Sequence, residues 1–221
     1  RSSCPVSRRV WLFDLDDTLH HASARIFPQI DRAMTAYVAR TLGVDHAEAD
    51  RLRLRYWQRY GATLTGLMRH HGTDPGDFLR QTHPLDDIPR HLVFDRALKH
   101  TLQRLGGRRI VFSNSPHHYA EAVLRGMGVR ECFDAVWCIE RLRFQPKPLP
   151  AAFHRLLREE GVPPARCVMV EDNAENLRTA KALGMTTVLV ARGHRLPSWV
   201  DVRVPSVLQL PRRRLPGSAT P

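Results

Sequence analysis

Five short apolar runs, separated by helical patterns, restrict the fold of this chain more than any other feature. From residue 98 onward, strand-like and helix-like segments alternate. Continuous apolar strands in such an alternation are typical of a parallel sheet that helices cover on both faces, so the sequence predicts an α/β core. The predicted strands are Val10–Phe13, Arg109–Phe112, Ala135–Ile139, Cys167–Val170 and Thr186–Val190, and the helices between the later ones are Tyr119–Met127, Phe153–Glu160 and Glu175–Leu183.

The segment between the first two predicted strands is helical instead. Apolar residues recur at helix spacing from Ile30 to Leu42, and Gly43 follows as a typical helix end. Asp50–Tyr60 and Thr63–His71 have the pattern of two further helices, and the segment contains no convincing strand pattern. The α/β core is therefore predicted to carry a helical insertion.

These patterns divide the chain into three parts. We expect residues 1–19 and 92–210 to form the core domain and residues 20–91 to form the helical insertion. Residues 211–221 are rich in Pro, Arg, Gly and Ser, and we expect them to be a disordered tail.

The charge balance and the cysteines limit the kind of partner. The 221 residues include 34 Lys and Arg against 22 Asp and Glu, a formal net charge of +12 that favours anionic ligands. The four cysteines match no zinc pattern, and Cys138 and Cys167 lie in apolar runs as packed thiols would. We therefore expect a reducing, cytoplasmic setting. Because no apolar run is long enough to span a bilayer, we expect no membrane partner.

Polar residues follow three of the predicted strands. Because the carboxyl ends of parallel strands meet at one edge of a sheet, we expect these side chains to converge there. Acids crowded together repel each other unless a cation lies among them, and Mg²⁺ binds a few carboxylate oxygens together with water and substrate phosphate oxygens. The polar residues are Asp14 and Asp16, Ser113 and Asn114, and Glu171 and Asp172, and Lys147 lies between two prolines.

The residue types at this edge suit phosphate chemistry. Asp14 and Asp172 could hold Mg²⁺. Ser113, Asn114 and Lys147 offer a hydroxyl, an amide and a positive charge, which are the groups that hold a phosphoryl oxygen.

Four motifs in a fixed order carry a family resemblance. They are DLDDT at Asp14–Thr18, FSNS at Phe112–Ser115, the lysine at Lys147, and VEDN at Val170–Asn173. In this order, the motifs resemble the haloacid dehalogenase superfamily, whose members are mostly Mg²⁺-dependent phosphatases. The resemblance covers nearly the whole chain. It implies a Rossmann-like, three-layer parallel-sheet core with an inserted helical cap of the C1 type.

The resemblance also implies a role for each motif residue. Asp14 would be the nucleophile that forms an aspartyl-phosphate, and Asp16 would be the general acid and base. The implied Mg²⁺ ligands are Asp14, Asp172 and the backbone carbonyl of Asp16, with Glu171 in support. Relatives that cleave carbon–halogen bonds lack an acid two residues after the nucleophile, so Asp16 favours phosphoryl transfer.

Shorter matches suggest a subgroup. Residues 27–30 (FPQI), 60–67 (YGATLTGL) and 112–116 (FSNSP) resemble the pyrimidine 5′-nucleotidase group. This similarity implies a nucleoside monophosphate substrate such as UMP or CMP. The group often has Tyr where this chain has His20 and a Gly-containing loop where it has Ser115–Pro116.

Five residues are candidates for contact with the rest of the substrate. Tyr56, Trp57, Tyr60 and Arg69 could stack on a base or bond a sugar, or they could pack between helices. His20 is close enough to the first motif to line the pocket.

Other functions stay open at this point. A phosphatase for sugar phosphate or phosphoglycolate and a phosphomutase are the alternatives among enzymes. A basic nucleic-acid-binding protein with a degenerate site is the alternative among binding proteins, and the intact motif residues argue against nucleic acid as the partner. We expect the partner to be a small-molecule phosphate ester, and the protein to be a monomer or homodimer.

Overall fold

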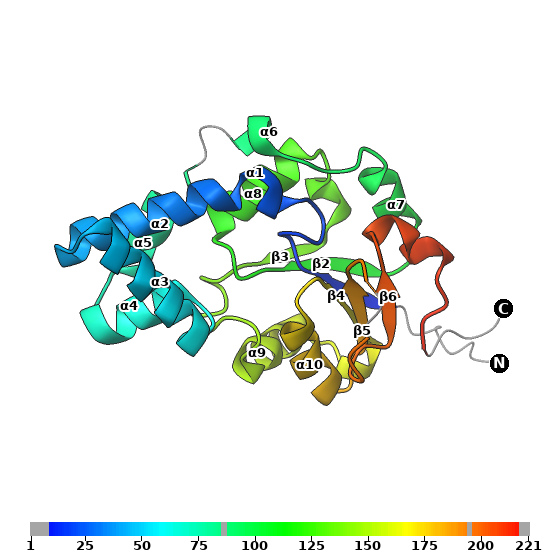
Figure 1. The fold of residues 1–221 in the computed structure, drawn as a ribbon. Helices are drawn as coiled ribbons and strands as arrows, with labels where there is room; N and C mark the ends of the chain where they lie inside the picture. The colour runs from blue at the N-terminus through cyan, green and yellow to red at the C-terminus, as the bar shows by residue number, and fades with distance from the viewer. Residues whose placement is uncertain (1–8, 85–87, 194–195, 217–221) are drawn as a thin grey trace, which may run out of the picture.

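The computed structural model describes residues 9–84, 88–193 and 196–216. In these residues, six parallel strands form one sheet in the order β3-β2-β1-β4-β5-β6 (Figure 1), which confirms the predicted α/β fold. The strands are β1 (Val10–Phe13), β2 (Arg108–Phe112), β3 (Ala135–Trp137), β4 (Cys167–Glu171), β5 (Thr186–Val190) and β6 (Val202–Val204). Strand β6 was not predicted, because its three residues Val-Arg-Val are too short to give a pattern.

Side chains of β1 alternate between two apolar layers. Trp11 and Phe13 lie in one buried cluster, and Val10 and Leu12 lie in the other. Cysteines contribute to both layers as buried free thiols, and Cys138 and Cys167 are packed as predicted. Helices α7 (Leu98–Arg104) and α8 (His117–Gly126) cover the first face, and α9 (Pro150–Glu160) and α10 (Ala174–Ala182) cover the second.

Between β1 and β2 the chain forms a group of helices beside the sheet (Figure 1). Their own buried cluster includes Tyr37, Tyr56, Leu64 and Phe78. Helix α5 was not predicted, because only two adjacent apolar residues mark its buried face. The helices are α1 (Ala22–Arg25), α2 (Phe27–Leu42), α3 (His46–Tyr60), α4 (Thr63–His71), α5 (Pro75–Thr82) and α6 (Ile88–His91).

The end of the insertion and the start of the predicted tail pack on the core. Ile88 of α6 is buried in the apolar cluster of β1 and α8. The expectation of disorder from residue 211 is wrong for residues 211–216. A 3₁₀ helix, η3 (Val207–Arg212), runs through Pro211, and the apolar side chain of Leu215 is buried in that same cluster. Residues 217–221 lie outside the described residues.

Within the described part of the chain, every helix is too short or too polar to cross a membrane.

Candidate active site

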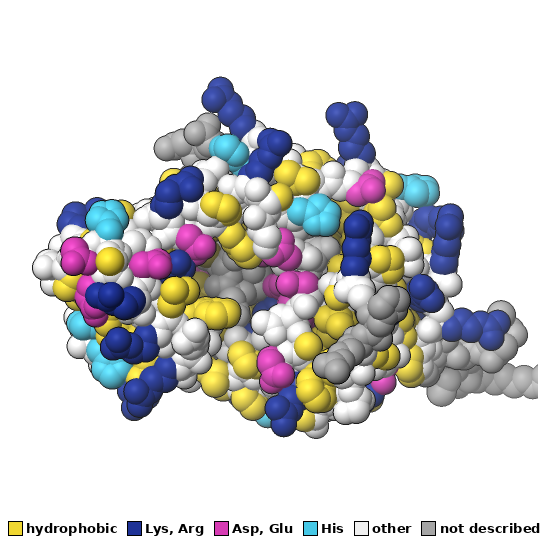
Figure 2. Space-filling model, in the orientation of Figure 1, with side chains coloured by type: hydrophobic (Ala, Val, Ile, Leu, Met, Phe, Trp, Pro, Cys, Tyr) yellow, Lys and Arg dark blue, Asp and Glu magenta, His cyan; other side chains and the backbone are white. Residues whose placement is uncertain are grey.

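A cavity of about 560 Å³ lies between the carboxyl ends of the central strands and the helical insertion. Figure 2 shows a hollow near the middle of this face, with acidic side chains in it. Asp14, Ser113, Lys147 and Asp172 line the cavity on the side of the sheet. Its volume falls in the range of about 300–1,000 Å³ that is usual for sites that bind small organic molecules.

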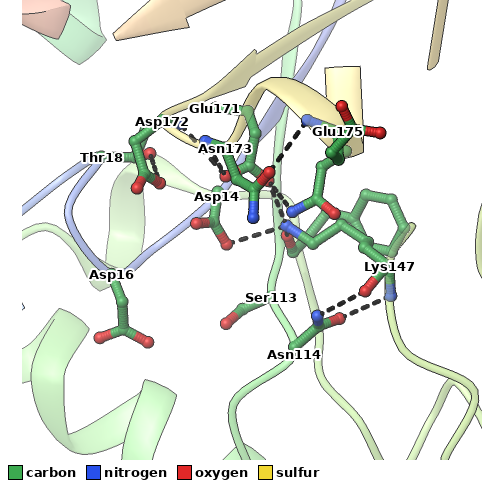
Figure 3. A network of polar contacts seen from close by, with 12 residues as sticks. Asp14, Asp16, Thr18, Ser113, Asn114, Lys147, Glu171, Asp172, Asn173 and Glu175 are labelled. Carbon is green, nitrogen blue, oxygen red and sulfur yellow. Dashed lines mark hydrogen bonds and ion pairs between the residues drawn. The ribbon is translucent and has the colours of Figure 1, made fainter. Parts of the chain in front are cut away.

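The strand order explains why distant motifs meet here. Strands β2, β1 and β4 are neighbours in the sheet, so Ser113, Asp14 and Asp172 follow adjacent strand ends (Figure 3). Two backbone hydrogen bonds extend the ladders past the strands: Asp14 N donates to Val170 O at 2.9 Å, and Ser113 N donates to Trp137 O at 2.9 Å. The site residues are thus fixed by the sheet itself.

Lys147 is the buried cation of this edge, with 2% of its surface exposed. Its Nζ donates to Asp14 Oδ1 at 2.9 Å, to Glu171 Oε2 at 2.7 Å and to Phe112 O at 2.7 Å. These three contacts use all the hydrogens of the ammonium group. Burial lowers the pKa of Lys147, but Asp14 and Glu171 raise it further, so the pKa lies above its usual value and the amine stays charged.

Asn114 positions Lys147 through the backbone. Asn114 Nδ2 donates to Lys147 O at 3.0 Å, and Lys147 N donates to Asn114 Oδ1 at 2.8 Å. Asn114 lies at the cavity, but both ends of its amide are used on the lysine loop. Ser113 Oγ accepts from Ser115 N at 3.0 Å, so its hydroxyl hydrogen is available for a ligand.

Glu171 is fully buried and accepts four hydrogen bonds. Oε1 accepts from the backbone N–H groups of Asp172 and Asn173 at 3.1 Å each, and Oε2 accepts from Lys147 and from Asn176 Nδ2, the latter at 2.9 Å. Burial raises the pKa of Glu171, but Lys147 and the hydrogen bonds outweigh it and hold the pKa below its usual range. Glu171 therefore orients the lysine and the loop after β4. Asn176, in the first turn of α10, was not predicted to belong to the site.

Asp14 and Asp172 carry the unbalanced charge of the site. Burial, and then Glu171, raise the pKa of Asp14 well above its usual value and that of Asp172 to about 7. One carboxylate oxygen each of Asp14, Glu171 and Asp172 lies within 4.8 Å of the others, and Thr18 Oγ1 donates to Asp172 Oδ1 at 3.1 Å. Crowded oxygen donors with raised pKa values fit a hard divalent cation such as Mg²⁺, which would supply the missing positive charge.

Asp16 faces away from Asp14 (Figure 3). Its Oδ1 hydrogen-bonds His20 Nε2 at 2.9 Å and Tyr119 OH at 2.6 Å, and its Oδ2 accepts from Ser115 Oγ at 2.5 Å. Burial raises the pKa of Asp16, but these three hydrogen-bond partners outweigh it and hold the pKa below its usual value. His20 is buried behind Asp16, rather than lining the pocket as expected. Ser115 stands in the second motif and Tyr119 a helical turn later, and sequence reasoning assigned neither of them to Asp16.

Among the candidates on the insertion, Trp57 lines the cavity. Tyr56 OH hydrogen-bonds His71 Nε2 at 2.7 Å, and its ring lies so close to Gly66 that a Cβ there would overlap it. Tyr60 OH hydrogen-bonds His70 Nε2 at 2.6 Å, and the guanidinium of Arg69 lies over the Tyr60 ring at 5.7 Å. Tyr56, Tyr60 and Arg69 therefore serve contacts between α3 and α4, the packing alternative of the sequence analysis, and they are not among the residues that line this cavity.

The fold and this edge define a class of protein: parallel α/β proteins with carboxylates and a buried lysine gathered at the strand ends beside an inserted helical layer. The family model of the haloacid dehalogenase-like hydrolases matches residues 9–184. The chain belongs to this family.

Several known phosphatases and related proteins are similar to the chain. In some cases the similarity covers less than two thirds of the relative's own length. Phosphate metabolism protein 8 of Saccharomyces cerevisiae is 28% identical over 201 residues, which cover 83% of this chain and 61% of the yeast protein. Hexitol phosphatase B of Escherichia coli is 32% identical over 109 residues, covering 48% of this chain and 49% of its own. Phosphoglycolate phosphatase of Rhodospirillum rubrum is 28% identical over 205 residues, covering 83% and 79%.

Solved structures share the fold. A HAD phosphatase from Thermococcus onnurineus superposes with a TM-score of 0.68 at 23% identity, covering 92% of this chain and 96% of that one. L-2-haloacid dehalogenase from Xanthobacter autotrophicus superposes with a TM-score of 0.61 at 19% identity, covering 92% and 97%. At these identities, both comparisons show a shared fold only.

Proposed function

We propose that this protein is a Mg²⁺-dependent phosphomonoesterase for nucleoside 5′-monophosphates, with pyrimidine nucleotides favoured. The observation that carries the proposal is the convergence of Asp14, Ser113, Lys147 and Asp172 on one side of a cavity large enough for such a ligand. The names of the relatives support phosphate-ester chemistry in general.

The residues at the sheet edge suit attack on phosphorus by Asp14. One oxygen of Asp14 is held by Lys147, which orients the carboxylate so that the other oxygen can form the bond to phosphorus as the bond to the leaving oxygen breaks. The Ser113 hydroxyl would donate to a phosphoryl oxygen. Mg²⁺, held by Asp14 and Asp172, would supply the positive charge that lets a carboxylate approach a phosphate dianion.

Asp16 is the acid and base in this proposal. It would give a proton to the leaving oxygen and later take one from the water that cleaves the aspartyl-phosphate. Because its carboxylate is held by His20, Ser115 and Tyr119 in this structure, its side chain must turn toward Asp14 to do so.

The size and lining of the cavity favour a nucleotide over a smaller ester. Phosphoglycolate would fill only a small part of about 560 Å³. Trp57, with 55% of its surface exposed, presents a flat apolar side chain at the cavity, which suits a planar base. A sugar phosphate is the second candidate, because hexitol phosphatase B is among the relatives.

A phosphate-release assay tests the proposal. UMP, CMP, AMP, a hexitol phosphate and phosphoglycolate are compared with Mg²⁺, with chelator, and with Mg²⁺ restored. We expect the highest kcat/KM for UMP or CMP, loss of turnover with chelator, and recovery with Mg²⁺. A higher kcat/KM for the hexitol phosphate or for phosphoglycolate would overturn the nucleotide assignment. Turnover that chelator does not change would overturn the metal requirement.

Asp14→Asn is the matched variant for this assay. It keeps the size of the side chain and removes the nucleophilic oxygen, so turnover should fall by about 10³-fold or more with a cooperative unfolding transition retained. Turnover within tenfold of the unchanged protein would show that another residue attacks phosphorus.

A further inference from the structure

The cavity has a second group of charged side chains, on the insertion, that the proposed chemistry does not use. Asp31 of α2 and Arg53 of α3 line it there. Arg53 Nη1 donates to Asp31 Oδ1 at 2.7 Å, and Arg53 Nε and Nη2 donate to Asp50 Oδ1 at 3.2 and 3.0 Å. Thr35 Oγ1 also donates to Asp50 Oδ1, at 3.1 Å. The guanidinium is thus held in place from two helices.

The burial of this pair is unequal. The side chain of Arg53 is 13% exposed, whereas that of Asp31 is 52% exposed. A surface ion pair is usually exposed on both sides, since long charged side chains prefer water. Here the planar cation is packed into the wall of the cavity and its acid partner remains open to the cavity and solvent.

The pair retains hydrogen-bonding capacity. A guanidinium has five N–H groups, and three of them have partners among the described residues, which leaves one on each Nη. Asp31 uses Oδ1 on Arg53, and Oδ2 has no hydrogen bond to the described part of the chain. The cavity wall therefore presents a donor directly beside an acceptor.

Apolar side chains line the cavity on the same two helices as the Asp31–Arg53 pair. They are Phe27, Ile30 and Met34 of α2 and Leu54 and Trp57 of α3. The hydroxyl groups of a sugar alcohol would lie against apolar side chains there and lose hydrogen bonds to water. A planar ring with polar groups only on one edge would place its apolar faces against these side chains and would not lose such hydrogen bonds.

We infer that Asp31 and Arg53 form the subsite that reads the polar edge of a pyrimidine base. A uracil edge places a carbonyl next to a ring N–H, and a cytosine edge places an acceptor next to an amino group. Arg53 would donate to the acceptor, Asp31 would accept from the donor, and Trp57 would cover the ring. This subsite rests on the proposed function, because the phosphate end must hold a nucleotide.

Steady-state kinetics on two substrates tests the subsite. UMP carries the base edge, and p-nitrophenyl phosphate has a ring without it. Arg53→Met keeps the apolar stem and removes the donors, so kcat/KM for UMP should fall about 10–100-fold, mainly through KM. The value for p-nitrophenyl phosphate should stay within about twofold. Arg51→Met is the matched control, because Arg51 lies on the same helix with a side chain 65% exposed and pairs with Glu48.

A second variant and a binding measurement test the subsite independently of Arg53→Met. Asp31→Asn changes an exposed side chain without changing its size, so the fold should hold while the KM for UMP rises. Competitive inhibition of p-nitrophenyl phosphate hydrolysis by uridine should weaken in Asp31→Asn and Arg53→Met and persist in Arg51→Met. Unchanged inhibition by uridine, or equal loss on both substrates, would overturn the subsite. If the unchanged protein hydrolyses p-nitrophenyl phosphate but neither UMP nor CMP, the proposed function fails instead.

Discussion

The two walls of the cavity differ in how the chain holds their polar groups. On the sheet side, Lys147 and Glu171 are buried, and neighbouring strands fix them through several hydrogen bonds each. On the insertion, Asp31 and Trp57 are more than half exposed and stand on two helices. A group that takes part in bond formation or proton transfer must be held closely in position. A group that selects among ligands can be replaced with little effect on the rest of the protein.

The largest effect is expected where a buried charge on the sheet side loses its partner. Lys147→Met leaves Asp14 and Glu171 buried without their cation, so the free energy of unfolding should fall by about 3 kcal/mol or more. Lys181→Met is the control, because the Lys181 side chain is 40% exposed where it pairs with Asp201, and its loss should cost at most about 1 kcal/mol. Urea unfolding of both variants measures the difference. Equal losses would show that burial does not make the ion pairs of Lys147 more important for stability than the pair of Lys181.

A smaller effect concerns pH. Burial and Glu171 raise the pKa of Asp172 to about 7, so the folded chain binds this proton more tightly than the unfolded chain does. Stability should therefore decline as pH rises through 7. Burial lowers the pKa of His83 to about 4, and its opposite contribution grows from about pH 4 and levels off only above about 6.5, where the unfolded chain loses that proton.

Thermal unfolding of the unchanged protein and of Asp172→Asn, compared between pH 6.5 and 8, isolates the contribution of this acid. Without metal, Tm should fall by about 1–3 °C across this window, and Asp172→Asn or added Mg²⁺ should flatten the decline. Asp201→Asn, which removes an acid already paired with Lys181, should keep the slope. A slope that persists in Asp172→Asn would place the raised pKa elsewhere.

The difference between the walls also explains what the sequence could predict. The motif residues after β1, β2 and β4 converge because parallel topology leaves only one edge for them. Which of those residues contact a ligand was harder to predict, since Asn114 turned out to hold the lysine loop and His20 to hold Asp16. Both roles depend on side-chain directions that spacing along the chain does not encode.

On the insertion, helical spacing left more undecided. Tyr56, Trp57 and Tyr60 all lie on α3, and only packing against α4 decides which of them faces the cavity. The sequence does not single out Arg53 and Asp31, because charged residues at helical spacing usually mark a solvated surface. The contact between them depends on α2 and α3 lying side by side, which is a tertiary feature.

The smallest expected effect separates two aromatics of one helix. Trp57→Ala removes a ring from the cavity wall, so the KM for UMP should rise about 2–10-fold, the usual contribution of a stacking contact. Tyr60→Ala, three residues further along α3, removes a ring that pairs with His70 and Arg69 and should leave KM unchanged. Because both variants delete an aromatic side chain from the same helix, a shared loss of stability cancels in the comparison. An equal rise in KM for both would mean that this wall acts only by holding the insertion together.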